Sequence, residues 1–256
     1  SVPKREHREM CMAKPTQHPV PERVPEHVVL IPDGNGRWAR RHGLPIAEGH
    51  RRGAKAVESF LRVCRDWDVP YATIWGFSTE NWARSAGEVK SIMQLVEGAL
   101  RRNRKSFRRD GIRLWHLGRR DRIRERYPRL YGLMMDLIEE TKENRPYHLN
   151  LALDYGGRNE IVRAVRAAAA LGTDLKSATW EQLEAHLDTR GQPDPDLIIR
   201  SSGEHRLSGI MPLQASYAEM VFLTRLLPEL SEEDFREALR AFASRDRRFG
   251  RRPVSS

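Results

Sequence analysis

The sequence predicts an α/β protein: a single domain with a mostly parallel central sheet that is flanked by helices. Short continuous apolar runs, typical of strands buried on both faces, alternate with longer stretches of helical periodicity along the whole chain. Strands that alternate with helices favour a parallel sheet with helices on both faces. The 256 residues are enough for one large domain of this class, and 39% hydrophobic residues are enough for its core.

The strands are predicted from short apolar runs. The first run, 27–31, is followed at once by a turn at 32–36 that contains two glycines. Further runs of the same kind predict strands at 71–77, 112–117, 148–154, 197–200 and 220–223.

The helices are predicted where apolar residues recur every three or four positions. This spacing predicts helices that include 54–64, 89–100, 121–143 and 159–171, then a short helix at 180–187 and a last helix at 232–247. The prolines of the segment 189–196 stop a helix before the fifth strand.

Residues 1–25 are rich in proline and charge and have no period, which predicts a flexible N-terminal arm ahead of a folded domain at 26–256. Cys11 lies in this arm and Cys64 lies in a helical pattern, so neither a disulfide framework nor a cysteine-rich metal site is indicated. No apolar run approaches the ~20 residues that span a bilayer, and the first residues have no hydrophobic signal core. We therefore expect a soluble cytoplasmic protein with no transmembrane segment.

The chain has 45 Lys and Arg against 35 Asp and Glu, a formal net charge of +10. This balance favours polyanionic partners: nucleic acid, an anionic membrane surface or phosphorylated substrates. Arginines crowd 101–129 and 245–252, but these stretches fall largely on helical patterns, and the 7% of aromatic residues form no stacking platform among them. Such runs are typical of solvated helix faces. We therefore expect no nucleic-acid partner, while peripheral contact with a membrane stays open.

The loops that leave the carboxyl ends of parallel strands are expected to carry the chemistry. The first of them, Asp33-Gly-Asn-Gly-Arg37, offers a phosphate glycine N–H groups, a helix N-terminus and a guanidinium. The Asp33 carboxylate would repel that phosphate unless a hard cation such as Mg²⁺ lay between them. An ordinary tight turn, with Asp33 capping a helix, explains the same residues equally well, and no Gly-Lys-Ser/Thr of a P-loop follows.

Three further loops have unusual compositions. The segment from Arg200 to Ser208 contains two arginines and three hydroxyls, which suits a diphosphate better than a merely solvated loop. The segment Ser78-Thr-Glu-Asn-Trp82 contains either helix-start residues or an Asn81 amide that faces a substrate. Tyr155-Gly-Gly-Arg158 is either an anion-binding helix start or a glycine-rich turn.

Taken together and in this order, the loops resemble the cis-prenyltransferase family, the undecaprenyl diphosphate synthase-like enzymes. The resemblance covers essentially residues 27–250. Its pieces are Asp33-Gly-Asn-Gly-Arg-Trp-Ala39, Gly49-His50 with Gly53, Phe77-Ser-Thr-Glu-Asn-Trp82, Leu149-Asn150 with Tyr155-Gly-Gly-Arg158, Arg200 to Ser208, Tyr217-Ala-Glu219 and Arg247-Arg-Phe-Gly250. It implies a homodimeric enzyme that condenses an allylic diphosphate with isopentenyl diphosphate, uses Mg²⁺ and releases diphosphate.

The resemblance also implies roles for single residues. Asp33 would hold Mg²⁺ on the allylic diphosphate, and His205 and Glu219 would support the metal. Ser78 and Asn81 match positions linked to guiding proton loss, and they complete the expected catalytic set with Asp33. The residues expected to bind substrate are Gly34, Asn35, Gly36, Arg37, Trp38, His50, Trp82, Arg84, Arg200, Arg206 and Ser208, joined by Arg248 and Gly250 from the other subunit.

The chain departs from the usual pattern of the family at Pro32, Ile46, Asp154 and Met211-Pro-Leu-Gln214. Ile46 stands where many members have an arginine near the allylic diphosphate. Two alternatives therefore stay open: an irregular head-to-middle coupling of two allylic diphosphates, as in lavandulyl-type products, and a noncatalytic prenyltransferase-like subunit or anion-binding module. The Asp33 carboxylate favours an enzyme, because a scaffold would not need it.

Two aromatic residues on strands predict a short product. The growing chain should enter an apolar tunnel between the sheet and the helices that follow the second and third strands. Trp75 and Tyr147 are bulky enough to fill such a tunnel, although strand aromatics more often simply fill the core. Because core density leaves no room for a long polyisoprenoid, we expect a product of about two or three isoprene units.

Overall fold

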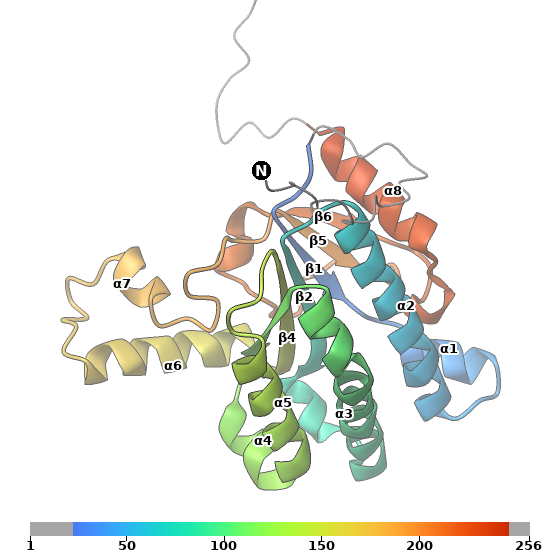
Figure 1. Ribbon diagram of the computed structural model, residues 1–256, viewed down its shortest axis with the longest axis horizontal. Helices are drawn as coiled ribbons and strands as arrows, with labels where there is room; N and C mark the ends of the chain where they lie inside the picture. Colours follow the sequence, from blue (N-terminus) through green and yellow to red (C-terminus); the bar gives the residue numbers. More distant parts are fainter. Residues whose placement is uncertain (1–22, 246–256) are drawn as a thin grey trace, which may run out of the picture.

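The computed structural model describes residues 23–245 and confirms the predicted fold class (Figure 1). Its centre is a six-stranded sheet in which each pair of neighbouring strands is parallel. In the order β3-β4-β2-β1-β5-β6, the strands are β3 Ile112–Leu117, β4 Tyr147–Tyr155, β2 Tyr71–Ser78, β1 His27–Ile31, β5 Leu197–Arg200 and β6 Glu219–Phe222. Each strand agrees with the sequence prediction to within one residue at either end.

The register places the first strand near the middle of the sheet. β1 pairs with β2 on one side and with β5 on the other, where Ile31 lies level with Arg200. Because all the strands run the same way, their carboxyl ends lie along one edge of the sheet. The loops that follow Ile31, Ser78, Tyr155 and Arg200 therefore start from the same edge.

Helices connect the strands and cover the sheet. They are α1 Asn35–Arg41, α2 Ile46–Asp66, α3 Ala86–Arg109, α4 Arg120–Arg126, α5 Pro128–Glu140, α6 Gly157–Ala170, α7 Trp180–Glu184 and α8 Glu232–Ala243, with short 3₁₀ helices η1 Thr79–Ala83, η2 Gln214–Tyr217 and η3 Leu227–Glu229. In Figure 1, α2, α3, α5 and α8 gather on one side of the sheet, and α6 and α7 extend away from it.

The single helix predicted at 121–143 is wrong. The structure has two helices there, because Pro128 has no N–H to donate and fits only the first turn of a new helix, α5. The last helix is also shorter than predicted and ends at Ala243. After β1, the chain forms α1 and α2 separately, with Gly43 at a positive φ of 64° between them.

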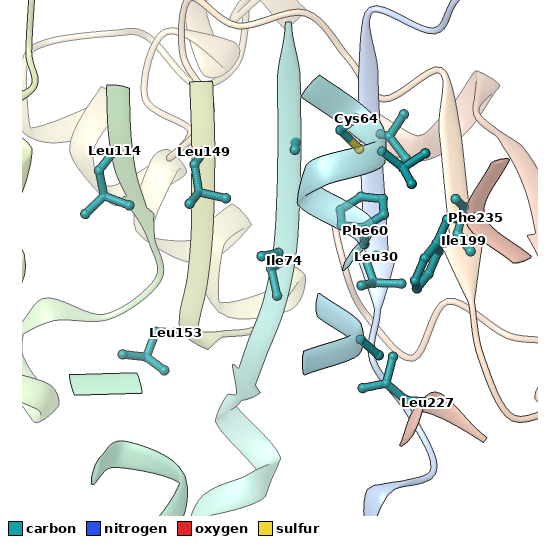
Figure 2. Close-up of a cluster of buried hydrophobic side chains, with 14 of the residues drawn as sticks. Leu30, Phe60, Cys64, Ile74, Leu114, Leu149, Leu153, Ile199, Leu227 and Phe235 are labelled. Carbon is teal, nitrogen blue, oxygen red and sulfur yellow. The ribbon is translucent and has the colours of Figure 1, made fainter. Parts of the chain in front are cut away.

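The main hydrophobic core lies between the sheet and α2, α3, α5 and α8. Figure 2 shows its side chains projecting from one face of five strands, Leu114, Leu149, Ile74, Leu30 and Ile199 among them. A smaller cluster covers the opposite face, where side chains from β1, β4 and β5 pack against the segment that contains η2. In the part of the chain that the structure describes, no helix is long and apolar enough to cross a membrane.

The predicted N-terminal arm overlaps the structure only at its end, since residues 1–22 lie outside the described range. At that end the chain is packed: Pro25 is buried, and the Arg23 guanidinium lies 4.2 Å from the centre of the Phe242 ring of α8. The folded part therefore begins slightly before residue 26.

Candidate functional site

The Asp33 carboxylate lies between two arginines at the carboxyl edge of the sheet. Arg200 at the end of β5 donates from Nη2 to Asp33 Oδ2 at 3.1 Å, and Arg37 on α1 approaches the same oxygen at 3.4 Å. The other oxygen, Oδ1, accepts the Gly34 N–H at 2.7 Å, and the Ser201 hydroxyl accepts the Asp33 N–H at 2.9 Å. The turn after β1 and the loop after β5 are thus joined around one carboxylate.

The loop after β5 is organised by Arg200, whose side chain is only 5% exposed. Its Nη1 donates to the Ser208 hydroxyl at 2.8 Å and to the carbonyl oxygen of Arg206. The Arg206 side chain is exposed and pairs with Glu204, which also accepts the Arg37 guanidinium at 3.1 Å. The structure therefore brings Arg200 and Ser208 to Asp33, and it leaves the Arg206 guanidinium at the rim.

Close packing of α1 against α2 positions Asn35. A β-carbon on Gly49 would overlap the Asn35 carbonyl oxygen, and one on Gly53 would overlap Asn35 Oδ1. Gly34, at a positive φ of 103°, has equally little room, because a β-carbon there would overlap the Ser202 hydroxyl. The glycines of this region are thus required by contact as well as by backbone conformation, and they hold the first turn of α1 beside Asp33.

His50 continues this cluster into α2. Its Nδ1 lies 3.3 Å from Asn35 Nδ2, which can only donate, so Nε2 carries the hydrogen toward Glu88 Oε1 at 3.3 Å. Glu88 also accepts the Arg84 guanidinium at 2.9 Å. Burial lowers the pKa of His50, and the hydrogen bond to Glu88 opposes this shift only in part. Asn35 Oδ1 is buried and has no hydrogen-bond partner among the described residues.

An apolar cavity of about 590 Å³ lies beneath the cluster, between the sheet and helices α2 and α3. Asn35 and His50 line it near the carboxyl edge of the sheet, and Tyr147 lines it where β4 begins, at the opposite edge. Much of the wall between these ends is aliphatic and includes Ala54, Val57, Leu61, Ile74, Ile92, Val96, Leu100, Leu149 and Leu151. A charged mouth above an apolar chamber suits a molecule with an anionic head and a hydrocarbon chain.

The predicted tunnel differs from the observed cavity in two respects. The cavity lies against α2 and α3, which follow the first and second strands, not the second and third. Trp75 does not line it, because side chains alternate along β2 and the cavity receives Ile74 and Gly76. Trp75 points to the other face, where its Nε1 donates to the Tyr155 carbonyl oxygen at 3.2 Å.

The segment after β2 places Ser78 and Asn81 at the same edge. The Ser78 N–H donates to Asn81 Oδ1 at 3.1 Å, and the Asn81 Nδ2 hydrogens have no protein acceptor among the described residues. Trp82 packs edge-on against Phe77 with 5.2 Å between ring centres, and its buried Nε1 has no partner among the described residues. The structure confirms the helix-start interpretation of this loop, and the contact of the Asn81 amide with a substrate stays a prediction.

Several expected site residues lie elsewhere. Trp38 is buried against Ala39 and Leu226 and stacks on His42 at 4.2 Å, so it packs α1 in place. His205 is exposed and stacks on Phe222 at 4.5 Å.

Glu219 lies level with Leu197, at the amino edge of the sheet and away from Asp33, and it pairs with Arg23 and Arg245 at 3.4 Å each. The structure therefore does not bring His205 and Glu219 together with Asp33 as a metal site within one chain. Arg248 and Gly250 lie outside the described residues.

The sequence prediction missed a buried network behind the site. Tyr155 donates its hydroxyl hydrogen to Glu160 Oε2 at 2.5 Å, and Gln214 Nε2 donates to the same oxygen and to the Thr189 hydroxyl at 3.1 Å. Burial raises the pKa of the Glu160 carboxyl. Gln214 belongs to the altered segment 211–214, so this network anchors the end of the loop that contains Arg200. Glu160 carried no local signal beyond its place in the first turn of a helix.

The Asp33 carboxylate suits a hard cation whose remaining ligands come from the substrate and from water. Asp33 stands between Pro32 and Asn35, which line the cavity, and within residues 23–245 no group of three or more His, Cys, Asp or Glu side chains is placed to hold a metal ion. Mg²⁺ is commonly bound by one or two carboxylates together with substrate phosphates and water, in contrast to a complete protein cage. A single carboxylate beside the glycine turn at 34–36 agrees with that mode.

The sequence profile of the family described as "Putative undecaprenyl diphosphate synthase" matches residues 31–250, which include every element from the end of β1 onward. The chain belongs to this cis-prenyltransferase family. An isoprenyl transferase of Aquifex pyrophilus is 42% identical to it over 90% of this chain and 97% of that protein. An isoprenyl transferase of Agrobacterium fabrum is 40% identical over 89% and 92%, respectively.

Two solved structures resemble the prenyltransferase. Lavandulyl diphosphate synthase from Lavandula x intermedia, in complex with dimethylallyl diphosphate, matches with a TM-score of 0.82 and 31% identity over 89% of this chain and 98% of that one. A probable undecaprenyl diphosphate synthase from Campylobacter jejuni matches with a TM-score of 0.73 and 27% identity over 90% and 100%. These findings show a prenyltransferase enzyme of isoprenoid biosynthesis and leave the way its substrates are coupled undecided.

The packing of α1 on α2 leads to a testable prediction. Gly53→Ala should displace Asn35 and with it the first turn of α1, so we expect kcat/KM for the allylic substrate to fall about 10- to 100-fold. The matched control is Gly87→Ala on α3, where a β-carbon meets nothing within 4 Å. Steady-state kinetics and circular dichroism of both variants check this. Equal activity of the two variants would show that the close approach at Gly53 does not position the site.

Proposed function

We propose that this prenyltransferase condenses an allylic diphosphate with isopentenyl diphosphate in a Mg²⁺-dependent reaction that releases diphosphate. The observation that carries the proposal is the place of Asp33, between Arg37 and Arg200 and next in the chain to Pro32, which lines the apolar cavity together with Asn35 and His50. An allylic diphosphate would put its charged head on this cluster and its hydrocarbon chain into the cavity.

The first turn of α1 would hold the allylic head. Its leading N–H groups have no acceptor within the helix, and they lie beside Arg37 and His50. Breaking the bond between the allylic carbon and the diphosphate oxygen builds negative charge on the leaving diphosphate. Fixed N–H donors and a guanidinium stabilise that charge without reorganising, and the apolar wall below excludes water from the cationic carbon.

Asp33 would hold Mg²⁺ on the allylic diphosphate, and bound Mg²⁺ would neutralise the charge of the leaving group. Asp33 Oδ2 is already shared between two guanidiniums, which would be freed to pair with phosphate oxygens once the carboxylate turned to a cation. His205 and Glu219 are not part of this proposal, because neither joins Asp33 within the described chain.

Arg200 and Ser208 would bind the diphosphate of isopentenyl diphosphate, with Arg206 closing over it from the rim. The double bond of this second substrate attacks the allylic carbon, a new carbon–carbon bond forms, and a proton then leaves the neighbouring carbon. Asn81 Nδ2 and the Ser78 hydroxyl would hold the diphosphate oxygens so that this proton faces a phosphate oxygen that can accept it.

One observation favours a second candidate, the head-to-middle coupling of two allylic diphosphates. The structure resembles that of lavandulyl diphosphate synthase with a TM-score of 0.82, and Ile46, the first residue of α2, leaves one basic contact absent near the allylic site. The organised Arg200 and Ser208 loop supports the ordinary coupling with isopentenyl diphosphate.

Incubation with labelled isopentenyl diphosphate, an allylic primer and Mg²⁺ tests the proposal. We expect a prenyl diphosphate from both substrates together and none from dimethylallyl diphosphate alone. Asp33→Ala should lower turnover by about 10²–10³-fold or more while the fold is retained, because it removes the proposed cation ligand. A branched product from dimethylallyl diphosphate alone would replace the proposal by the second candidate, and no product from any primer would refute both.

The cavity also limits the product, for which we propose a short chain. A cavity of about 590 Å³ has the volume of an ordinary small-ligand pocket, which suits a short chain of about four isoprene units or fewer. Tyr147 lines the far end, where its hydroxyl donates to Asp68 Oδ1 at 2.7 Å. This aromatic residue is therefore placed to stop the growing chain.

Two variants test which face of the sheet sets the product length. Tyr147→Ala should lengthen the product, because it opens the far end of the cavity. Trp75→Ala removes an aromatic residue from the opposite face and should leave the product length unchanged. Chromatography of the dephosphorylated products checks both expectations. Wild-type chains much longer than about four units, or a longer product from the Trp75 variant alone, would contradict the steric argument.

We further propose that the enzyme is a homodimer that acts in the cytoplasm. Several large apolar side chains of the described chain are exposed. Val162, Leu171, Leu175 and Trp180 lie on or near α6 and α7, and Leu213 and Tyr217 follow the Arg200–Ser208 loop. Figure 1 shows α6 and α7 extending away from the sheet, where a second copy could cover them. The free thiol of Cys64 agrees with a reducing compartment.

Mixing two inactive variants tests whether subunits share a site. Arg200→Ala removes the proposed diphosphate ligand from one chain, and Arg248→Ala removes the basic residue expected to come from the partner. If each site uses Arg200 of one chain and Arg248 of the other, random mixing should restore about a quarter of wild-type activity. The control is each variant mixed with itself. No recovery in a population shown to exchange subunits would exclude sharing.

A further inference from the structure

A second cavity, of about 300 Å³, lies at the carboxyl end of the edge strand β3. It shares no lining residue with the substrate cavity. Its charged walls are formed by Arg119, Arg120, Arg163, Arg190, Asp121 and Asp188, four cations against two anions. The pocket is thus polar and carries a formal excess of two positive charges, which favours an anionic ligand.

Ion pairs within the pocket occupy two of its four guanidiniums, and the other two have no carboxylate partner among the described residues. Arg163 binds both oxygens of Asp188 at 2.9 and 2.5 Å, and Arg119 binds both oxygens of Asp121. Arg120 and Arg190 are exposed, and neither has a carboxylate partner in the part of the chain that the structure describes. Two guanidiniums without a carboxylate partner on one pocket offer charged N–H donors, each with the planar geometry that phosphate oxygens match.

The side chain of His116 places a second, independent requirement on a ligand of this pocket. It lines the pocket and is only 4% exposed. Its Nε2 lies 2.9 Å from the Leu153 carbonyl oxygen and must donate to it, so Nδ1 is a bare acceptor. Nδ1 is buried without a partner among the described residues. Burial lowers the pKa of His116 to about 4, so the ring stays neutral and Nδ1 keeps its lone pair near neutral pH. A ligand group that reaches this nitrogen must therefore be a hydrogen-bond donor.

We propose that this pocket binds a small free phosphate anion, with Arg120 and Arg190 pairing with its charged oxygens and His116 Nδ1 accepting its hydroxyl hydrogen. Hydrogen phosphate combines negative oxygens and a hydroxyl in one compact group, whereas sulfate at the same pH carries the charge without the hydrogen. The pocket thus predicts a preference between two anions of nearly the same size and shape.

Isothermal titration and thermal unfolding of the full chain at constant ionic strength test the site. Phosphate should raise the unfolding midpoint of the wild type more than sulfate does, because it binds the folded state. The double variant Arg120→Ala with Arg190→Ala should bind phosphate at this site about tenfold or more weakly. The matched control is Arg124→Ala, an exposed arginine of the same helix α4 that does not line the pocket.

Phosphate that binds at the substrate cluster contributes equally in all these variants, so it cancels in the comparison. The proposal is overturned if the double variant and Arg124→Ala respond alike to phosphate, or if the difference between these two variants is as large with sulfate as with phosphate. A response only to vesicles that contain phosphatidic acid would also overturn it, because the ligand would then be a lipid headgroup and not a free anion. None of these outcomes depends on prenyl transfer, so the test stands apart from the proposed reaction.

Discussion

The buried guanidinium of Arg200 is the constraint around which the site is built. A charged group that is 5% exposed must be paired and hydrogen-bonded, and the neighbouring loops supply Asp33, the Ser208 hydroxyl and the Arg206 carbonyl oxygen as its partners. The register of β1 with β5 sets Arg200 level with Ile31, two residues before Asp33. The sheet therefore determines that carboxylate and guanidinium meet, and it fixes positive charge at the place where we propose that the substrate binds.

Because side chains alternate along each strand, the two faces of the sheet are built differently. On one face, small and aliphatic residues of β2 and β4 leave a cavity under α2 and α3. On the other face, Trp75 and Tyr155 pack into a dense cluster that is backed by Glu160 and Gln214. Because successive side chains point to opposite faces, an aromatic residue that would block the cavity at position 74 or 76 is harmless at position 75. The packed face supports the loops, and the hollow face is the one that we propose receives the hydrocarbon chain.

The excess of positive charge is distributed and is not one continuous patch. Many arginines of α3 pair with carboxylates of the same helix or of its neighbours, as Arg101 does with Glu97 and Arg104 with Glu140 of α5. Such exposed pairs contribute little and behave as solvated helix faces. Of the arginines without a carboxylate partner in the described chain, Arg120 and Arg190 line the β3 pocket, whereas Arg124 and Arg129 are exposed and line neither cavity. Net charge alone therefore indicated the class of ligand but not its place.

The sequence by itself determined the strand positions, the parallel sheet and the loops that contain Asp33 and Arg200, because burial on both faces and strand-to-helix turns leave local signatures. The break at Pro128 also has a local cause, because proline donates no N–H and fits only the first turn of a helix. Only the tertiary structure decided that Glu219 lies at the opposite edge from Asp33 and that Trp75 turns away from the cavity. Register between strands and the face that a side chain takes depend on contacts between residues far apart in the chain, and no local pattern records them.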